Sequence, residues 1–433
     1  MSKQRHYYYI EGFDPANPSK VKYTERPIES DDTFEDDLIM LAFPLDMLKN
    51  VSSVLSAFNL RDDSEYFFNE CREVVSVPEK HVNEKGEGKL TFQSYFHKFP
   101  DSVTPFFEDL IAVVMIHPRE KKDGNYRDYN MIGYINVNKI EFKDHQGNIH
   151  PGYYYNVLRM SEATVGGEAI YRRKKLFSCM FSVLLDLVTV NDVHFVYANM
   201  GRENQGILDA LHKNTERNGK FYETFPMRNN THVNFVMGSK SAEKKLVDIS
   251  HDKARLKEYY QMIHDLRGNY MFNQYFTEEK FFNLIDRILG SSSTSKVYMI
   301  PDENNKIAAA GFFVNWADYL YVKLQNPKGF FKLIDSLQIT DRILLATQLV
   351  GEPAQTRQLL KGATQYFKSK HKVKVTLLNG HDGDKHFEVK KSVIYDPFLY
   401  FVIYDRPELY AALKEHSKDE HGNIRLFVDT PML

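Results

Sequence analysis

The sequence predicts a mixed α/β (α+β) protein of two domains, each a mixed, largely antiparallel twisted sheet flanked by helices. Three observations lead to this prediction. The chain has 433 residues, more than one ordinary hydrophobic core accommodates. Its first half reads as helices, then an antiparallel meander, then a strand–helix–strand unit. The second half repeats this order more faintly, which indicates an internal repeat.

The N-terminal segment is polar up to Asp37 and contains three prolines, so we expect a strand or two and a surface loop there. From Asp37 to Leu60 the apolar residues recur at helical spacing, which predicts an amphipathic helix or a helix pair broken at Pro44. A further helix is predicted over residues 65–74, and a loop over residues 78–89.

Three strands are expected to form the meander. Residues 110–117 (LIAVVMIH) are typical of a buried strand, and residues 131–142 of a second one. The segment Asp144 to Asn148 predicts a hairpin turn into a long strand, residues 153–165. Alternation along that strand places Tyr154 on the face opposite to its two tyrosine neighbours.

The stretch over residues 152–204 organises the first half. After the long strand come a cationic turn, Arg172 to Lys175, a helix from about Leu176 and a strand over residues 193–198. A helix that begins just after a strand presents unpaired N–H groups and its positive dipole end, which favour an anion. With four cationic side chains, the turn could bind a pyrophosphate. Equally, it could be the solvated first turn of an ordinary core helix.

The segment YRRKKLFS, residues 171–178, resembles the pyrophosphate loop of the GNAT (N-acetyltransferase) superfamily. That loop has the form Arg/Gln-x-x-Gly-x-Gly/Ala. Arg172 is at its first position, and Lys175 and Phe177 occupy its glycine positions. The resemblance implies that acetyl-CoA, or another acyl-CoA, is the co-substrate. Its implied binding residues are Val165, Gly167, Arg172, Arg173, Lys174, Lys175, Leu176, Phe177, Ser178 and Asn204.

The same resemblance implies direct attack of an amine on the thioester. Backbone N–H groups near Val165 and Gly167 would polarise its carbonyl. A general base and an acid would assist. The candidate bases are Glu162 and Glu168, each of which could instead be a surface carboxylate. The candidate acids are Tyr171, His212 and Tyr222, because Leu211 stands where the superfamily often has a tyrosine.

A charged segment over residues 239–256 predicts a linker, which divides the chain into domains 1–245 and 246–433. In the second domain, Leu349 to Pro353 matches Val165 to Ala169, and Arg357 alone remains of the cationic cluster. We therefore expect a degenerate copy that serves in substrate recognition or dimerisation. Helices are predicted at 253–266, 278–289 and 356–370, strands at 297–300, 307–314 and 373–378, and a last hairpin at 393–404.

Several classes of protein are disfavoured. A formal net charge of −2 gives no field that attracts nucleic acid. Two cysteines, Cys71 and Cys179, form neither a disulfide framework nor a metal cluster. Residues 379–386 have the composition of a tight turn rather than a metal site. The N-terminus lacks the features of a signal peptide, and no segment is long and apolar enough to span a membrane, so we expect a cytoplasmic protein.

The sequence therefore predicts an N-acyltransferase, specifically an N-acetyltransferase, that acts on a small-molecule or peptide amine without a metal and can form a homodimer. The alternative is a catalytically inactive binding or scaffold protein on the same fold, which the missing glycines and tyrosine favour. A third alternative is recognition of an acylated or aminoacylated carrier in the groove between domains. The resemblance also implies that the C-terminal carboxylate of Leu433 could act as a base, as in some tandem members of the superfamily, although a frayed terminus is the simpler expectation.

Overall fold

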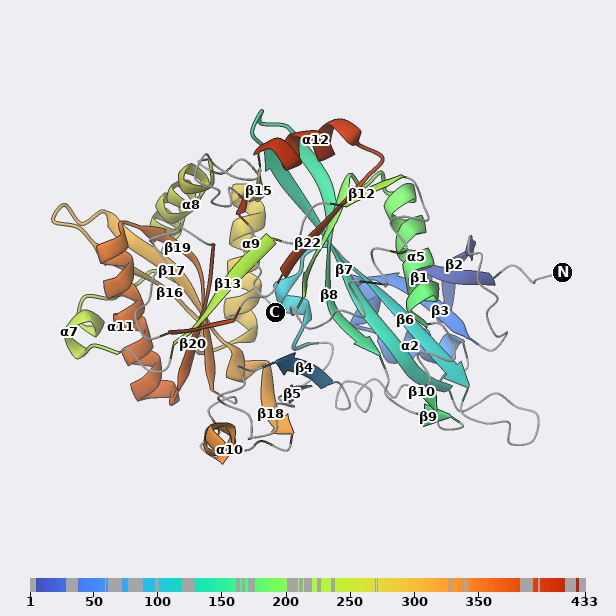
Figure 1. Cartoon of the computed structure of the whole chain (residues 1–433), viewed down its shortest axis with the longest axis horizontal. Coiled ribbons are helices and arrows are strands. Elements are labelled where there is room, and N and C mark those ends of the chain that lie inside the picture. Colours follow the sequence, from blue (N-terminus) through green and yellow to red (C-terminus); the bar gives the residue numbers. More distant parts are fainter. Residues whose placement is uncertain are drawn as a thin grey trace.

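Two twisted sheets lie side by side in the computed structural model, with α9 (Glu278–Ser291) between them (Figure 1). The structure describes residues 5–28, 38–58, 60, 72–76, 89–97, 101–118, 129–160, 164–165, 168–169, 176–200, 209, 213, 220–223, 227–234, 238–268, 270, 272–325, 327, 329–336, 338, 342–381, 392–395, 398–416 and 426–427.

The first sheet carries the meander that the sequence predicts. Its β8–β11 and β1–β3 pairs are parallel, and its other pairs are antiparallel. The predicted strands at residues 110–117 and 131–142 are confirmed. In spatial order the strands are β2 (Asn17–Ile28), β1 (Arg5–Asp14), β3 (Ile39–Pro44), β6 (Leu110–Pro118), β7 (Tyr129–Asp144), β8 (Ile149–Met160), β11 (Phe195–Met200), β22 (Phe398–Tyr404) and β12 (Phe221–Glu223).

The second sheet has a similar plan, with β19 and β20 as its parallel pair. In spatial order its strands are β14 (Val247–Asp248), β16 (Lys296–Pro301), β17 (Ile307–Asn315), β19 (Ile343–Gly351), β20 (Val375–His381), β13 (Met227–Asn234) and β21 (Ser392–Tyr395). The predicted helices are confirmed as α8 (Lys253–Arg267), α9 and α11 (Pro353–His371). Two shorter helices are α7 (Lys240–Glu243) and α10 (Gly329–Ser336), and α12 (Pro407–His416) follows β22.

The two halves of the chain exchange strands. β13 precedes the second half in sequence, yet it pairs with β20 and β21. In return β22, near the end of the chain, pairs with β11 and β12 of the first half. The predicted hairpin over residues 393–404 is therefore wrong. The alternation of apolar residues identifies the two arms of this predicted hairpin as strands, but it carries no information about which strand edges they pair with.

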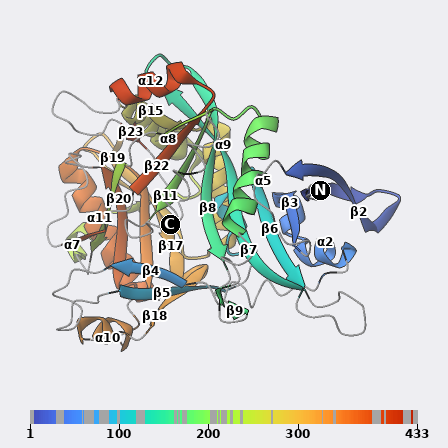
Figure 2. The same ribbon diagram turned by 45° about the vertical axis from the view of Figure 1, so that its right-hand side comes forward.

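Smaller ladders complete the fold. β4 (Arg72–Ser76), β5 (Lys89–Phe96) and β18 (Leu320–Gln325) form a three-stranded sheet from both halves, which Figure 2 shows below the main sheets. β15 (Phe272–Tyr275) of the second half pairs with the end of β7 and with β23 (Leu426–Phe427). The short strands β9 (Thr164–Val165) and β10 (Glu168–Ala169) pair with each other.

The prediction of helix from Asp37 onward is wrong in its first part. Residues 39–44 form β3, which pairs with β6 along its whole length. Helix follows only as α1 (Leu45–Leu48) and α2 (Val51–Ala57). Because β3 is buried between β1 and β6, both of its faces are apolar, and a short fully apolar run has no periodicity that separates strand from helix. Arg72 to Val74, predicted as the end of a helix, are also strand.

The predicted hairpin turn after β7 is confirmed. The Asp144 carboxylate accepts hydrogen bonds from the backbone N–H groups of Gln146 (2.8 Å) and Asn148 (2.9 Å). Gly147 supplies the positive φ of 89° that the turn requires. Although burial opposes it, hydrogen bonding from His150 and Asn148 lowers the pKa of Asp144 to about 2.

Helix α5 (Leu176–Val190) begins where the sequence predicts and covers one face of the first sheet. Its buried residues recur at helical spacing, as in Cys179, Val183 and Leu187, and they pack with Tyr153 of β8. Tyr154 belongs to a different cluster on the opposite face, as alternation along β8 predicts.

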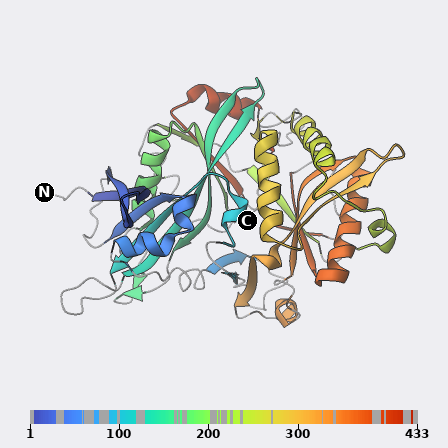
Figure 3. The same ribbon diagram turned by 180° about the vertical axis from the view of Figure 1, so that it is seen from behind.

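One hydrophobic core continues from the first half into the second. Phe106, in the 3-10 turn η2 (Thr104–Phe106), packs edge-on against Tyr319 at 4.8 Å between ring centroids. The buried side chains of α9, including Leu284 and Ile288, belong to the same core. Figure 3 shows α9 at this junction from the opposite side. The halves therefore share apolar packing as well as strands.

Candidate functional site

The parallel strands β8 and β11 separate part-way along their length. They pair over four residues, from Gly152 with Phe195 to Tyr155 with Ala198. Beyond these, β8 continues to Met160 and β11 to Met200. On its other side β11 remains paired with β22 along its whole length. Among the described residues, the sheet is thus open between the carboxyl ends of β8 and β11, the kind of place where ligands bind in many α/β proteins.

A β-bulge in β8 lies at this opening. Arg159 is opposite Tyr134 and Asn156 is opposite Asn136, so two residues of β8 face Ile135 alone. A bulge bends its strand and leaves backbone groups without a ladder partner. Bulges are frequent beside active sites for this reason.

Two buried asparagines face each other next to the bulge. Asn136 is 0% exposed and Asn156 is 6% exposed. The Tyr134 hydroxyl donates a hydrogen bond to Oδ1 of Asn136. Nδ2 of Asn136 and both amide atoms of Asn156 have no hydrogen-bond partner among the residues that the structure describes. Such groups cost free energy, so buried polar groups without partners mark places where a ligand or water binds.

The structure places only part of the predicted site. Val165 and Glu168 are paired in the small ladder of β9 and β10, beyond the end of β8. Leu176, Phe177 and Ser178 form the first turn of α5, and the Phe177 ring contacts Phe181 at 4.8 Å between centroids. The other predicted site residues lie outside the described residues: Glu162, Gly167, Tyr171, Arg172, Arg173, Lys174, Lys175, Asn204 and His212.

Tyr222, a predicted acid, lies in β12, which pairs with β22. Its ring packs against Tyr410 of α12 at 5.3 Å between centroids. In the sheet, β22 and β11 separate β12 from β8. This position supports a role for Tyr222 in packing α12 onto the sheet.

Helix α5 is held in place by a polar contact with the N-terminal hairpin. The buried hydroxyl of Tyr7 donates a hydrogen bond of 2.5 Å to Oδ2 of Asp186. Arg26 makes an ion pair with the same oxygen at 3.4 Å. Burial first, and then the hydrogen bond to Asp186, raise the pKa of Tyr7, so this hydroxyl stays protonated as the donor.

The second half contains a counterpart of the opening. β19 pairs with β20 only from Ile343 to Ala346 and carries a bulge at Gln348, whose φ is 54°. Here α8 supplies the missing partners. The Tyr259 hydroxyl donates to the Gln348 carbonyl oxygen at 2.6 Å, and Arg267 donates to its Oε1 at 2.5 Å. The bulge of the second half is therefore satisfied by the chain itself.

The two bulges also correct the internal alignment. The register places Met160 opposite Gly133 in the first sheet and Gly351 opposite Ala309 in the second. Met160, not Gly167, is thus the counterpart of Gly351. The sequence match failed because residues 161–175 intervene between β8 and α5, whereas only Glu352 separates β19 from α11.

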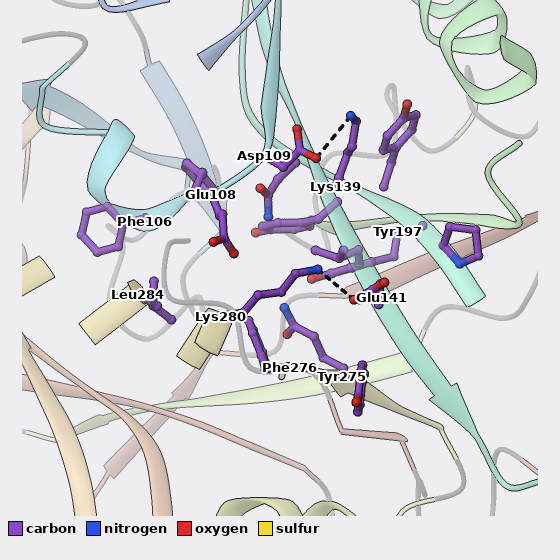
Figure 4. A pocket seen from close by; sticks show the side chains of 18 of the residues that line it. Phe106, Glu108, Asp109, Lys139, Glu141, Tyr197, Tyr275, Phe276, Lys280 and Leu284 are labelled. Carbon is purple, nitrogen blue, oxygen red and sulfur yellow. Dashed lines mark hydrogen bonds and ion pairs between the residues drawn. The ribbon is translucent and has the colours of Figure 1, made fainter. Parts of the chain in front are cut away.

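A cavity of about 550 Å³ lies at the junction of the halves (Figure 4). Strands β7 and β8 form one wall, and β15 and α9 form the other. Figure 4 shows two ion pairs beside it, Lys280 with Glu141 and Lys139 with Asp109. The cavity extends from Tyr154 toward Pro151, at the start of β8, whereas the bulge lies beyond Asn156 in the opposite direction along the strand.

Sequence reasoning missed Asn136 and Asn156. A signal was present, because Asn136 and Asn138 interrupt the apolar run of β7 at positions two apart, which share one face of a strand. Their partner on β8 could be identified only from the register of the hairpin.

Neither the family models of known proteins nor the curated proteins contain a match to this chain. The bulged strand, the opening and the helix that follows, present in both halves, define a GNAT-type fold. Two crystal structures of Saccharomyces cerevisiae N-myristoyltransferase with bound myristoyl-CoA share it, with TM-scores of 0.53 and 0.50 and 13% sequence identity. Both alignments cover 87% of this chain, and they cover 81% and 85% of those chains, respectively.

Two further properties concern the described ranges only. None of the helices in them combines the length and the apolar composition needed to cross a membrane. They also contain no group of three histidine, cysteine or acidic residues arranged to hold a metal ion.

Proposed function

We propose that the protein is an acyl-CoA-dependent N-acyltransferase whose reaction takes place at the opening between β8 and β11. The observation that carries the proposal is the contrast between the two bulges. In the first half, three buried amide atoms of Asn136 and Asn156 lack partners. In the second half the counterpart pair is Phe312 and Thr347, and Tyr259 and Arg267 of α8 donate hydrogen bonds to the bulge residue Gln348 beside it. A site used for a ligand is expected to keep such groups available.

The acyl donor would enter with its pantetheine chain beside β8, in the manner of an added strand. Backbone N–H groups released by the bulge would polarise the thioester carbonyl. The positive end of α5 would face the pyrophosphate, and Arg172 to Lys175, which precede the helix in sequence, would neutralise it. The N-myristoyltransferase structures, which contain myristoyl-CoA, support an acyl-CoA donor.

In this mechanism an amine attacks the thioester carbon directly. The C–N bond forms, the C–S bond breaks and coenzyme A leaves as a thiol. A base such as Glu162 or Glu168 would take the proton from the amine, and His212 or Tyr171 would protonate the sulfur. Amides of Asn156 would orient the acceptor, which we propose to be a small-molecule or peptide amine.

We propose acetyl as the transferred group, with a longer acyl chain as the competing possibility. The second half would not bind coenzyme A, because its bulge is closed by α8. Its proposed role is to complete the first sheet through β22 and to form the junction cavity. The competing proposal, a binding protein without activity, is favoured by Lys175 and Phe177 at the glycine positions of the loop.

Isothermal titration tests the proposal. Acetyl-CoA and myristoyl-CoA are titrated into the wild type, into Arg172→Ala/Lys174→Ala and into Arg357→Ala, the matched control on α11. We expect one donor to bind the wild type with micromolar affinity. The double variant should bind it at least tenfold more weakly, as removal of charge-assisted hydrogen bonds predicts, and the control should bind it as the wild type does.

A turnover assay then separates the two proposals. Release of free thiol from the bound donor is followed with a panel of amines. Thiol release that depends on the amine supports an enzyme. Binding without thiol release for any amine supports the binding protein. Failure of both donors to bind contradicts the enzyme and leaves the binding protein.

A further inference from the structure

The junction cavity has the properties of a second binding site, separate from the opening at the end of β8. Both halves build it: β7 and β8 contribute Lys139, Glu141 and Tyr154, and β15 and α9 contribute Gln274 and Arg287. Its volume, about 550 Å³, is within the range of pockets that bind small molecules.

The charges of the cavity balance. Three ion pairs line it, and they join Lys139 to Asp109 at 3.2 Å, Lys280 to Glu141 at 2.9 Å and Arg287 to Glu108 at 3.8 Å. Two of the three connect α9 to the first half. A site with equal numbers of carboxylates and cations has no net attraction for a polyanion such as a nucleotide, and it favours a ligand whose own charges cancel.

The ion pairs on α9 define two ends. Lys280 and Arg287 are seven residues apart on the helix, and at 1.5 Å per residue they are roughly 10 Å apart along its axis. Gln274 belongs to the Lys280 end, because β15 pairs with β7 beside Glu141. The distance between the two ends sets the length of ligand that can reach both.

Each end has a polar side chain that can make a further hydrogen bond or ion pair. Gln274 is 4% exposed, and its Oε1 has no hydrogen-bond partner within the described part of the chain. It therefore needs a donor. At the other end, Arg287 donates from Nε to the Pro105 carbonyl oxygen at 3.3 Å and lies loosely against Glu108. Burial lowers the pKa of Arg287 despite Glu108, so a second anion would stabilise the guanidinium.

The wall between the two ends is aromatic. Tyr154 and Tyr197 stack in parallel at 4.6 Å between ring centroids. Phe106 and Phe276 also line the cavity. Aromatic faces contact a planar amide backbone or an alkyl chain without requiring hydrogen bonds from it.

We propose that the junction cavity binds a zwitterion of about the length of a tripeptide, with its carboxylate at Arg287 and its ammonium group at Gln274 and Glu141. The length follows from the helix, because three extended residues span roughly 10 Å. The ammonium group would donate to Oε1 of Gln274. The proposal does not depend on acyl transfer, since the cavity lies at the start of β8, away from the bulge.

The test is isothermal titration without any acyl donor, using glycine, diglycine, triglycine, N-acetyltriglycine and triglycine amide. We expect triglycine to bind, glycine to bind at least tenfold more weakly, and each blocked form to lose roughly 10- to 100-fold in affinity, as removal of one charge-assisted hydrogen bond predicts. Equal binding of triglycine and both blocked forms, or no binding of any probe, would overturn the proposal.

Two variants assign the ends. Arg287→Gln should bind triglycine and its amide equally, because the group that distinguishes a carboxylate is gone. Gln274→Leu should reduce the preference for triglycine over its N-acetyl form. Lys22→Gln, an exposed lysine on β2, is the charge-matched control and should bind as the wild type does. If Arg287→Gln and Gln274→Leu both still discriminate fully between triglycine and its blocked forms, the assignment of the two ends is contradicted. The comparison of ligands on the wild-type protein tests the proposal even if a variant does not fold.

Discussion

Asn136 of β7 and Asn156 of β8 face each other across the hairpin, buried, with three of their four amide atoms lacking a hydrogen-bond partner among the described residues. The counterpart pair in the second half is Phe312 and Thr347. Beside it, Tyr259 and Arg267 of α8 donate hydrogen bonds to the bulge residue Gln348. The same bulge thus occurs twice in the fold, with unpartnered amide atoms beside it in the first half and hydrogen bonds from α8 in the second.

Replacing Asn156 with leucine should separate function from stability. The change removes two unpartnered amide atoms at similar volume, so we expect a free energy of unfolding that is unchanged or higher by up to about 1 kcal/mol. Acyl transfer should fall at least tenfold, since the acceptor loses its orienting group. Asn50→Leu, at an exposed position after α1, is the control. A stable variant with full activity would show that Asn156 does not serve the reaction.

The hydroxyl of Tyr7 should stabilise α5 on the sheet. Tyr7→Phe leaves the ring in place but removes the donor to Asp186, which we expect to lower the free energy of unfolding by about 1–2 kcal/mol. Urea denaturation measures it. Tyr23→Phe, at an exposed tyrosine of the same hairpin, should change little. Equal urea midpoints for Tyr7→Phe and Tyr23→Phe would contradict a stabilising contribution of the Tyr7 hydroxyl.

Strand exchange should make the halves interdependent. A fragment of residues 1–245 lacks β22, so β11 and β12 would present unpaired edges, and we expect it to aggregate. Co-expression with residues 246–433 should restore a soluble complex, seen by size-exclusion chromatography. The intact chain should unfold in one calorimetric transition. A monomeric fragment 1–245 that unfolds cooperatively would contradict the prediction.

Acidification should weaken the contact between His194 and His150, whose Nδ1 atoms are 3.2 Å apart. Burial first, then Arg406 and His150, lower the pKa of His194 below 6.5, against the opposing effect of Asp192. The unfolded chain therefore binds the proton more tightly. The contribution of neutral His194 to the free energy of unfolding is present above the pKa of the unfolded state and is lost as the pH falls through the pKa of the folded state.

Thermal midpoints recorded from pH 8 to pH 5 test this sign. His194→Gln should show a shallower decline below about pH 6.5, the ordinary histidine pKa, than the wild type. His251→Gln, at an exposed position, should follow the wild-type curve. A decline of the same slope in all three proteins would assign the acid sensitivity to other groups.

Much of the fold could be predicted from local patterns of apolar and turn residues in the sequence. The apolar spacing that predicts α5 and the Asp144 turn depends on neighbours along the chain, so the sequence alone located both. It failed at β3, where burial on two faces removes the periodicity. The basic turn before α5, Arg172 to Lys175, lies outside the described residues, and the coenzyme A contacts there stay predictions.

Sequence by itself therefore determined the order of the elements and the mixed α/β class, because hydrophobic periodicity and turn chemistry are local properties of the chain. Tertiary structure alone decided that β22 completes the first sheet, that Asn136 meets Asn156, and that Gln274 and Arg287 share one cavity. Each of these depends on which strand edges and helix faces pair over long sequence separations, and no local pattern contains that information.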